Sequence, residues 1–346
     1  MKILVPGTIA LDLTPGPTAP ADRDTSPGDV STDDGSTGDP STGRDDREAP
    51  VEVVGYDAAA PLPAEHRDAE VLVAWANSPE NLADAAAHLP RLRWVQTLAA
   101  GPDAILAAGF APEVVVTNGR SLHDGPVAEH ALALTLAAVR RLDRLGAAQR
   151  ERRWDSAMVD EQADPATGGR FTLHGARVTI WGFGSIAARL APLYAALGAH
   201  VRGVASTAGE RHGFPVVTDE DLPRVLATTD VLVSLLPAVP ATRHAFDAAR
   251  IDELPDHAVF VNVGRGATVD EEALVAALRE GRLGAAALDV TETEPLPSDS
   301  PLWDAPRTII TPHVAGGRPQ GASALVRENL ANLRAGRPLR NVVPRG

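Results

Sequence analysis

The stretch that decides the fold is Arg177–Leu197, RVTIWGFGSIAARLAPLYAAL. Its first five residues predict a buried strand, and the residues after the glycines predict a helix. Gly182 permits a tight turn, Gly184 allows close approach to a pyrophosphate, and Ala187 allows the helix to pack closely on the strand. Because a helix N-terminus binds phosphate through its free N–H groups, the stretch predicts a dinucleotide site. Within the loop, the further predicted contacts are Ser185 and Ile186.

Short apolar runs continue on the C-terminal side of this stretch and alternate with helical segments. Most are continuously apolar, as expected for strands of a parallel sheet that is covered on both faces. The predicted strands are Arg177–Trp181, His200–Val204, Val231–Leu236, Val259–Val263, Ala285–Val290 and Thr308–Thr311.

The N-terminal part shows a similar alternation. Its predicted strands are Lys2–Val5, Val51–Tyr56, Val71–Trp75, Trp94–Gln96 and Val114–Thr117. A long helix is predicted over Val127–Leu145, opened by Gly125-Pro126, and a last helix over Gly321–Leu333 should return the chain to the first domain. We therefore predict an α/β protein of two Rossmann-like, doubly wound parallel-sheet domains. Residues 1–119 plus 317–346 form a flavodoxin-like substrate domain completed by the C-terminal tail, and residues 120–316 form the dinucleotide-binding domain.

Charge and composition narrow the class of protein. The 346 residues carry a formal charge of −14 and contain no cysteine, which argues against a nucleic-acid partner and excludes thiolate metal sites and a Cys nucleophile. No apolar run approaches the roughly 20 residues of a membrane span. The segment 14–50 holds nine Asp or Glu against three Arg, with Val30 as its only large aliphatic residue, and is predicted to be a disordered acidic insertion. We expect a cytoplasmic protein without a membrane partner.

The residue that contacts the 2′ position of the cofactor ribose is expected about 20 residues after the glycines. The acidic residue typical of NAD enzymes is replaced there by Ala205, which removes the repulsion of a 2′-phosphate. Ser206, Thr207 and Arg211 could contact that phosphate, so NAD(P)H is the predicted cofactor, with NADP(H) slightly favoured. Elsewhere in this domain, the predicted cofactor contacts are Leu236, Pro237, Val263 and Gly316.

Three charged side chains follow predicted strands at the carboxyl edge of the sheet, where open α/β sheets bind ligands. His313 can protonate an oxygen that forms when a keto carbon receives hydride, and Glu294 can orient and stabilise its imidazolium. Arg265 can hold a substrate carboxylate or polarise the carbonyl. The segments that carry these residues are Val261–Gly266, Leu288–Pro295 and Thr311–His313.

From Val51 to the C-terminus, the chain resembles the D-isomer-specific 2-hydroxyacid dehydrogenase family. The resemblance implies that Arg265, in N-x-x-R-G, orients the substrate, and that Glu294, directly before Pro295, tunes the acid/base His313. It places Asp289 near the nicotinamide carboxamide. In the first domain it assigns the backbone N–H groups of two residues to the substrate carboxylate, and these residues are Ala100 and Gly101.

The resemblance also implies interconversion of a 2-keto acid and an (R)-2-hydroxy acid, of the glyoxylate/hydroxypyruvate reductase type, by a homodimer. Two alternatives stay open. One is a nucleotide-sensing, corepressor-like binding protein, which retention of all three charged residues disfavours. The other is an enzyme for another acid, such as formate or a phosphorylated acid of the phosphoglycerate dehydrogenase type, for which Arg120 and Arg318 are candidate phosphate ligands.

Overall fold

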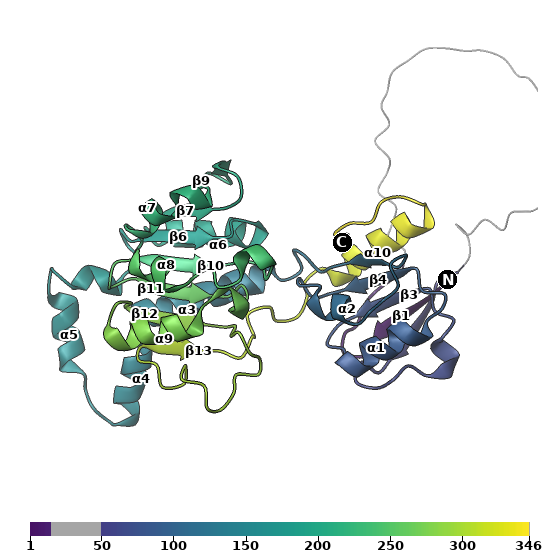
Figure 1. The fold of residues 1–346 in the computed structure, drawn as a ribbon, viewed down its shortest axis with the longest axis horizontal. Helices are drawn as coiled ribbons and strands as arrows, with labels where there is room; N and C mark the ends of the chain where they lie inside the picture. Colours follow the sequence, from purple (N-terminus) through teal and green to yellow (C-terminus); the bar gives the residue numbers. More distant parts are fainter. Residues whose placement is uncertain (15–49, 346) are drawn as a thin grey trace, which may run out of the picture. The chain divides into compact units, whose positions relative to one another are not determined.

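The computed structural model describes residues 1–14 and 50–345, so the disorder predicted for 14–50 concerns residues that, apart from the two end positions, lie outside the described part. The chain divides into two compact units, which are residues 1–122 with 319–346 and residues 123–318 (Figure 1). Within residues 1–14 and 50–345, no helix combines the length and the apolar character that a membrane span requires.

The first unit is built on a parallel sheet with the order β2-β1-β3-β4-β5, which is the flavodoxin-like order. Helices α1 and α2 pack on one face of this sheet, and the C-terminal helix α10 packs on the other. The elements are β1 (Lys2–Pro6), β2 (Glu52–Tyr56), β3 (Val71–Ala74), α1 (Pro79–His88), β4 (Trp94–Thr97), α2 (Asp103–Ala107), β5 (Val115–Thr117) and α10 (Ala322–Arg334).

Hydrogen bonds as well as apolar packing attach the C-terminal segment to the first unit. Asn329, buried on α10, donates to Gln96 Oε1 at 3.0 Å, and its own Oδ1 accepts from the Arg340 amide at 2.7 Å. The Val343 amide donates to the Val116 carbonyl at 2.9 Å. The tail is therefore an integral part of this unit.

The second unit contains an eight-stranded sheet with the order β13-β12-β11-β10-β6-β7-β9-β8. All its strand pairs are parallel except β8 with β9. From β6 the strand order extends to one edge of the sheet, and from β10 it extends to the other edge. The topological switch point, where such folds bind ligands, therefore lies between β6 and β10. The strands are β6 (Arg177–Trp181), β7 (His200–Val204), β8 (Gly209–Arg211), β9 (Phe214–Val217), β10 (Val231–Ser234), β11 (Val259–Asn262), β12 (Ala285–Leu288) and β13 (Thr308–Ile310).

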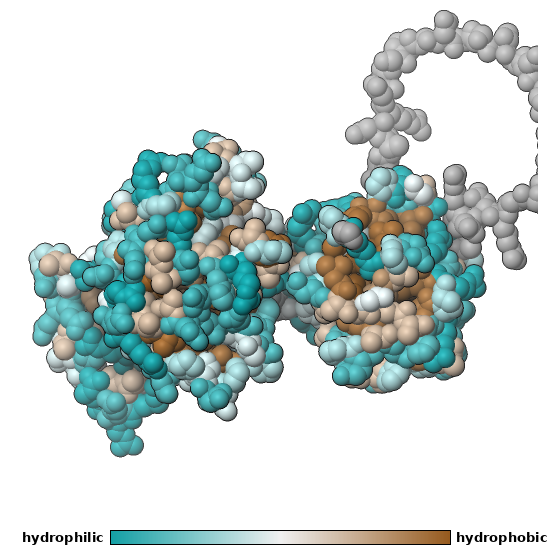
Figure 2. Space-filling model, viewed as in Figure 1, coloured by the Kyte–Doolittle hydropathy of each residue, from teal (hydrophilic) through white to brown (hydrophobic). Residues whose placement is uncertain are grey.

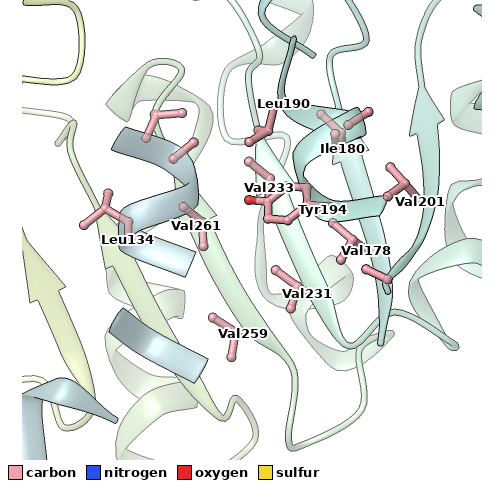
Figure 3. Packing of buried hydrophobic residues seen from close by; sticks show 14 of the residues in the cluster. Leu134, Val178, Ile180, Leu190, Tyr194, Val201, Val231, Val233, Val259 and Val261 are labelled. Atoms are coloured by element: carbon pink, nitrogen blue, oxygen red, sulfur yellow. The ribbon is translucent and has the colours of Figure 1, made fainter. Parts of the chain in front are cut away.

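Helices cover both faces of this sheet, as the continuously apolar strands require. On one face, Leu190 and Tyr194 of α6 pack over Val178 and Val233, while Leu134 of α3 lies on the same face (Figure 3). Helices α7, α8 and α9 pack on the other face. The helices of this unit are α3 (Asp124–Val139), α4 (Leu142–Arg150), α5 (Ser156–Ala163), α6 (Ser185–Ala196), α7 (Leu222–Leu226), α8 (Ala248–Asp252) and α9 (Glu271–Glu280).

Short 3-10 helices join several elements. They lie at Ala64–His66 in the first unit and, in the second, at Gly168–Phe171, Asp219–Asp221, Pro240–Thr242 and Gly266–Thr268.

The predicted fold class is confirmed, with two local corrections. The helix predicted over Val127–Leu145 is wrong as one element, because Arg141 adopts a left-handed backbone (φ 53°) and separates α3 from α4. Helices α4 and α5 then project from the sheet and are tied together by Arg144, which pairs with Asp155 at 2.8 Å and Glu161 at 2.9 Å (Figure 1). The strands β8 and β9 were not predicted, because they are short and β9 carries Pro215, which disfavours a strand.

The surface of the second unit is mostly hydrophilic on the face shown in Figure 2. Among the described residues, several large apolar side chains are nevertheless exposed on the projection formed by α4, α5 and their connection. Trp154 has the largest exposed fraction, at 85%. The others on this projection are Leu142 and Val159.

Stability should depend on a carboxylate at the amino-terminal edge of the second sheet. Burial acts to raise the pKa of Asp230, but hydrogen bonds from Arg177 and His257 lower it to about 2. Asp230→Asn should therefore reduce the free energy of unfolding by about 2 kcal/mol near neutral pH. The stabilisation is present above the unfolded-state pKa of about 3.9 and is lost as the pH falls toward the folded-state value.

Urea denaturation of both proteins at several pH values measures this difference. The two stabilities should converge as the solution is acidified below about pH 4. A difference that stayed constant down to about pH 3 would contradict the ionic origin of the effect.

Candidate active site

The glycine-rich loop after β6 has the geometry that a bound pyrophosphate needs. Gly182 has φ +99°, and a Cβ there would lie 2.9 Å from the Leu235 carbonyl, so only glycine fits. A Cβ on Gly184, the N-cap of α6, would meet no atom within 4 Å. The open space at the helix N-terminus fits a phosphate group, and Ala187 lies fully buried behind it.

The short strand β8, which follows β7, brings a cation to the predicted ribose position. Arg211 on β8 donates from Nη1 to the Phe183 carbonyl at 2.9 Å and from Nη2 to the Thr207 carbonyl at 3.0 Å. The β8–β9 hairpin thus places this guanidinium between the glycine-rich loop and the loop of Ala205–Thr207. The arrangement fits a 2′-phosphate, and the acidic side chain that would repel one is missing from Ala205.

The loop after β11 is shaped by a buried asparagine. Asn262 donates from Nδ2 to the Arg265 carbonyl at 3.1 Å, and its Oδ1 accepts from the Gly264 amide at 3.0 Å. A Cβ on Gly266 would lie 1.9 Å from the carbonyl carbon of Thr291, so the loop packs directly against the segment after β12. The Asn and Gly of the N-x-x-R-G pattern therefore fix the backbone conformation of this loop. The loop places Arg265, half-buried, at the carboxyl edge of the sheet.

The acid/base candidate and its carboxylate meet as the sequence predicts. His313 Nδ1 lies 2.7 Å from Glu294 Oε2, and Glu294 Oε1 accepts from the Thr291 amide at 3.1 Å. Among the described residues, Nε2 of His313 has no hydrogen-bond partner, and 48% of the side chain is exposed. One ring nitrogen is thus bound to the carboxylate while the other is open to a ligand.

Asp289 plays a part that the sequence did not reveal. It is almost completely buried, and its carboxylate accepts from Thr311 Oγ1 at 2.6 Å and from the amides of Val314 and Ala315 at 3.0 and 2.9 Å. The Asp289 carbonyl also accepts from the amide of His313 at 2.8 Å. Asp289 therefore holds the segment that carries His313, in addition to any contact with a cofactor.

His130, on α3, belongs to the same cluster and was missed as a site residue. Its Nε2 lies 3.0 Å from Thr311 Oγ1 and 3.3 Å from Asp289 Oδ1. A histidine in a mostly apolar helix segment was the only signal in the sequence. Its partners are far away in the chain, so that signal could not be interpreted.

A pocket of 530 Å³ adjoins the His313–Glu294 pair within the second unit. Trp303 donates from Nε1 to the Pro297 carbonyl at 2.8 Å and presents its ring to this pocket. The apolar lining beside the pair comes from Pro295, Leu296, Trp303 and Ile310. The pocket can accommodate an apolar group next to the imidazole.

In the first unit, the predicted carboxylate-binding loop follows β4. Asn118 Nδ2 donates to the Ala100 carbonyl at 2.9 Å, and a Cβ on Gly119 would lie 2.0 Å from the Leu98 carbonyl oxygen. The loop is therefore clamped by the segment that follows β5. Among the described residues, the amides of Ala100 and Gly101 donate to no acceptor, so both remain available to an anion.

The fold and these side chains together define a nicotinamide-dependent dehydrogenase, and comparison with known proteins identifies the family. The family described as D-isomer specific 2-hydroxyacid dehydrogenase, NAD binding domain, matches residues 132–315. A glyoxylate/hydroxypyruvate reductase A from Escherichia fergusonii is 31% identical over 299 residues, covering 81% of this chain and 88% of the relative. The counterpart from Salmonella newport is 33% identical over 270 residues, covering 74% and 81%.

Solved structures agree. A D-isomer specific 2-hydroxyacid dehydrogenase from Xanthobacter autotrophicus Py2, in complex with NADPH and MES, has a TM-score of 0.71 and 32% identity, covering 89% of this chain and 96% of that one. An NADPH-dependent glyoxylate/hydroxypyruvate reductase from Sinorhizobium meliloti, in complex with NADP and sulfate, has a TM-score of 0.70 and 28% identity, covering 85% and 90%. The chain belongs to the D-isomer specific 2-hydroxyacid dehydrogenase family. It is an NAD(P)-dependent oxidoreductase, as the sequence predicted.

Proposed function

We propose that the protein is an NADPH-preferring reductase of small 2-keto acids, of the glyoxylate/hydroxypyruvate type, that forms the (R)-2-hydroxy acid. The observation that carries the proposal is the 2.7 Å contact between His313 Nδ1 and Glu294 Oε2, which leaves Nε2 open to a ligand. The names of the relatives from Escherichia fergusonii and Sinorhizobium meliloti support the substrate type.

We propose one role for each of these residues, as the resemblance to the family implies. The bound nicotinamide would supply hydride from its C4 to C2 of the keto acid. His313 donates the Nε2 proton to the keto oxygen, and Glu294 stabilises the imidazolium before the transfer. Arg265 polarises the carbonyl and neutralises negative charge on the substrate. The amides of Ala100 and Gly101 bind the substrate carboxylate.

Substrate assays test this function directly. NADPH oxidation would be followed with glyoxylate, hydroxypyruvate, pyruvate and phenylpyruvate, and with a phosphorylated 2-keto acid. The chirality of the product would be determined for every acid except glyoxylate, whose product has no stereocentre. Turnover highest with glyoxylate or hydroxypyruvate supports the proposal. Turnover confined to the phosphorylated acid would favour a phosphoglycerate dehydrogenase-type enzyme. Cofactor binding without turnover on any acid would favour a nucleotide sensor.

Arg211 should set the preference for NADPH. Replacing it by Gln removes the cation that lies between the glycine-rich loop and Thr207, so the KM for NADPH should rise about 10- to 100-fold, as expected for the loss of a charge-assisted contact. The KM for NADH should change little, because NADH has no 2′-phosphate. Steady-state kinetics with both cofactors measure the ratio, and an equal loss for NADH and NADPH would count against this role.

We further propose a homodimer in which the projection formed by α4 and α5 contacts the second copy. The exposed apolar side chains of Leu142, Trp154 and Val159 support it, because such residues are typical of interfaces. Light scattering should give the mass of two copies, and Trp154→Glu should shift the protein toward the monomer. A wild-type protein with the mass of one copy would rule the dimer out.

A further inference from the structure

A charged residue lies inside the second sheet where an apolar one is expected. Strand β7 runs between β6 and β9, and Arg202 stands at its centre, in register with Thr179 of β6. It shares the sheet face of Val204, which belongs to the core under α7, and the equivalent face of β10 carries Leu232. Strands covered on both faces normally carry apolar residues, so an Arg at this position requires another explanation.

Arg202 is only partly compensated by its surroundings. Its guanidinium makes one hydrogen bond, from Nη2 to Thr228 Oγ1 at 3.1 Å, and among the described residues no carboxylate oxygen lies within salt-bridge distance. Burial lowers the pKa of Arg202, and the neighbouring Arg177 and Arg224 lower it further, while Asp230 acts in the opposite direction. A guanidinium has five N–H donors, so most of its hydrogen-bonding capacity is unused by protein groups.

The nearby carboxylates are engaged by other cations. Asp230 pairs with Arg177 at 2.9 Å and with His257 at 2.9 Å. Asp221 pairs with Arg224 at 2.9 Å on the exposed surface. Among the described residues, no carboxylate is therefore left to pair directly with Arg202.

A pocket of 490 Å³ opens beside this guanidinium. Its polar lining is contributed by His200, Arg202, Arg224 and Thr228, and its apolar lining includes Pro215, Val217 and Val225. The pocket includes the first residues of β7, whereas the glycine-rich loop and the catalytic candidates follow the ends of their strands. It is therefore a different place in the fold from the proposed active site.

We propose that this pocket is a second ligand site, which binds the phosphate or carboxylate group of a small organic anion. Arg202 can bind two oxygens of such a group through two parallel N–H donors of its guanidinium. Arg224 and His200 supply further donors from the rim. The apolar wall provides a surface for the uncharged part of the ligand.

The test uses inorganic phosphate and malonate as probes, each titrated at constant ionic strength against chloride. Because the proposed active site also binds anions, the titrations are made on full-length Arg211→Gln/Arg265→Gln protein as well as wild type. Thermal unfolding reports binding as a saturable rise in Tm, and the ³¹P line width of phosphate reports it independently of stability. Phosphate binding alone would identify a phosphate ligand, and malonate binding alone a carboxylate.

We expect saturable binding in the Arg211→Gln/Arg265→Gln background, weakened about tenfold or more when Arg202→Gln is added. Should that variant fold poorly, Arg224→Gln changes an exposed rim residue and should weaken binding several-fold. The proposal is overturned if the background variant no longer binds either probe, or if binding is unchanged by Arg202→Gln and by Arg224→Gln.

Discussion

His313→Ala is expected to turn over glyoxylate with NADPH about 10²- to 10⁴-fold more slowly than the wild type, because general acid catalysis contributes an effect of this size. Binding of NADPH should be nearly unchanged, since the glycine-rich loop and Arg211 are separate from the imidazole in sequence and in their contacts. The His313→Ala variant should also fold normally. The backbone of this segment is held by Asp289, whose bonds to Thr311 and to the amides of residues 314 and 315 do not involve the imidazole.

Controls separate chemistry from structure in this experiment. Glu294→Gln keeps the shape of the carboxylate's side chain but removes its charge, so kcat should fall while fluorescence-detected cofactor binding persists. His88→Ala removes an exposed histidine on α1 whose only hydrogen-bond partner in the described part of the chain is Asp84, and should leave kcat unaltered. A His313→Ala protein with wild-type kcat would refute the proposed acid/base role while leaving the fold and family intact.

Gly266→Ala is expected to destabilise the second unit by about 3 kcal/mol or more, the upper end of what overpacking usually costs. The added methyl would lie 1.9 Å from the carbonyl carbon and 2.0 Å from the carbonyl oxygen of Thr291, both backbone atoms that no rotamer change can move. The loop with Arg265 and the segment before Glu294 would have to separate. Activity should therefore be lost together with stability.

The matched control is Gly184→Ala, whose methyl would point into open space at the N-terminus of α6. This variant should keep the wild-type unfolding midpoint in urea, within about 1 kcal/mol, but bind NADPH more weakly. Comparison of the two variants distinguishes Gly266, which is needed for packing, from Gly184, which faces the proposed ligand. Equal midpoints for Gly266→Ala and wild type would show that the two loops are not in the close contact described.

Much of the fold could be predicted because its determinants are local. Most strands of the two sheets are apolar runs, and the glycine-rich loop has fixed spacing between a strand and a helix. The meeting of His313 and Glu294 could be predicted as well, because the ends of parallel strands converge on one edge. By contrast, the break at Arg141 has no proline or glycine to indicate it, and the β8–β9 hairpin is too short to stand out.

The rest depends on contacts between residues that are distant in the chain. From the sequence, Asp289 was predicted to lie near the cofactor. Only the structure shows that its carboxylate holds the segment of residues 311–315 by hydrogen bonds. Arg202 reads as one charge in a short strand. Its environment is formed by α7 and β9, which line the same pocket without supplying a carboxylate, and no local pattern reveals this arrangement.

The attachment of α10 to the first unit has a consequence for how the chain matures during synthesis. Residues 123–318 are contiguous, so the second unit has all its parts once that stretch has left the ribosome. The first unit emerges earlier but must wait for Asn329, Val343 and the apolar face of α10 before its sheet is covered. The half of the protein that is made first is therefore finished last, and until then its uncovered strands are the part of the nascent chain most in need of a chaperone.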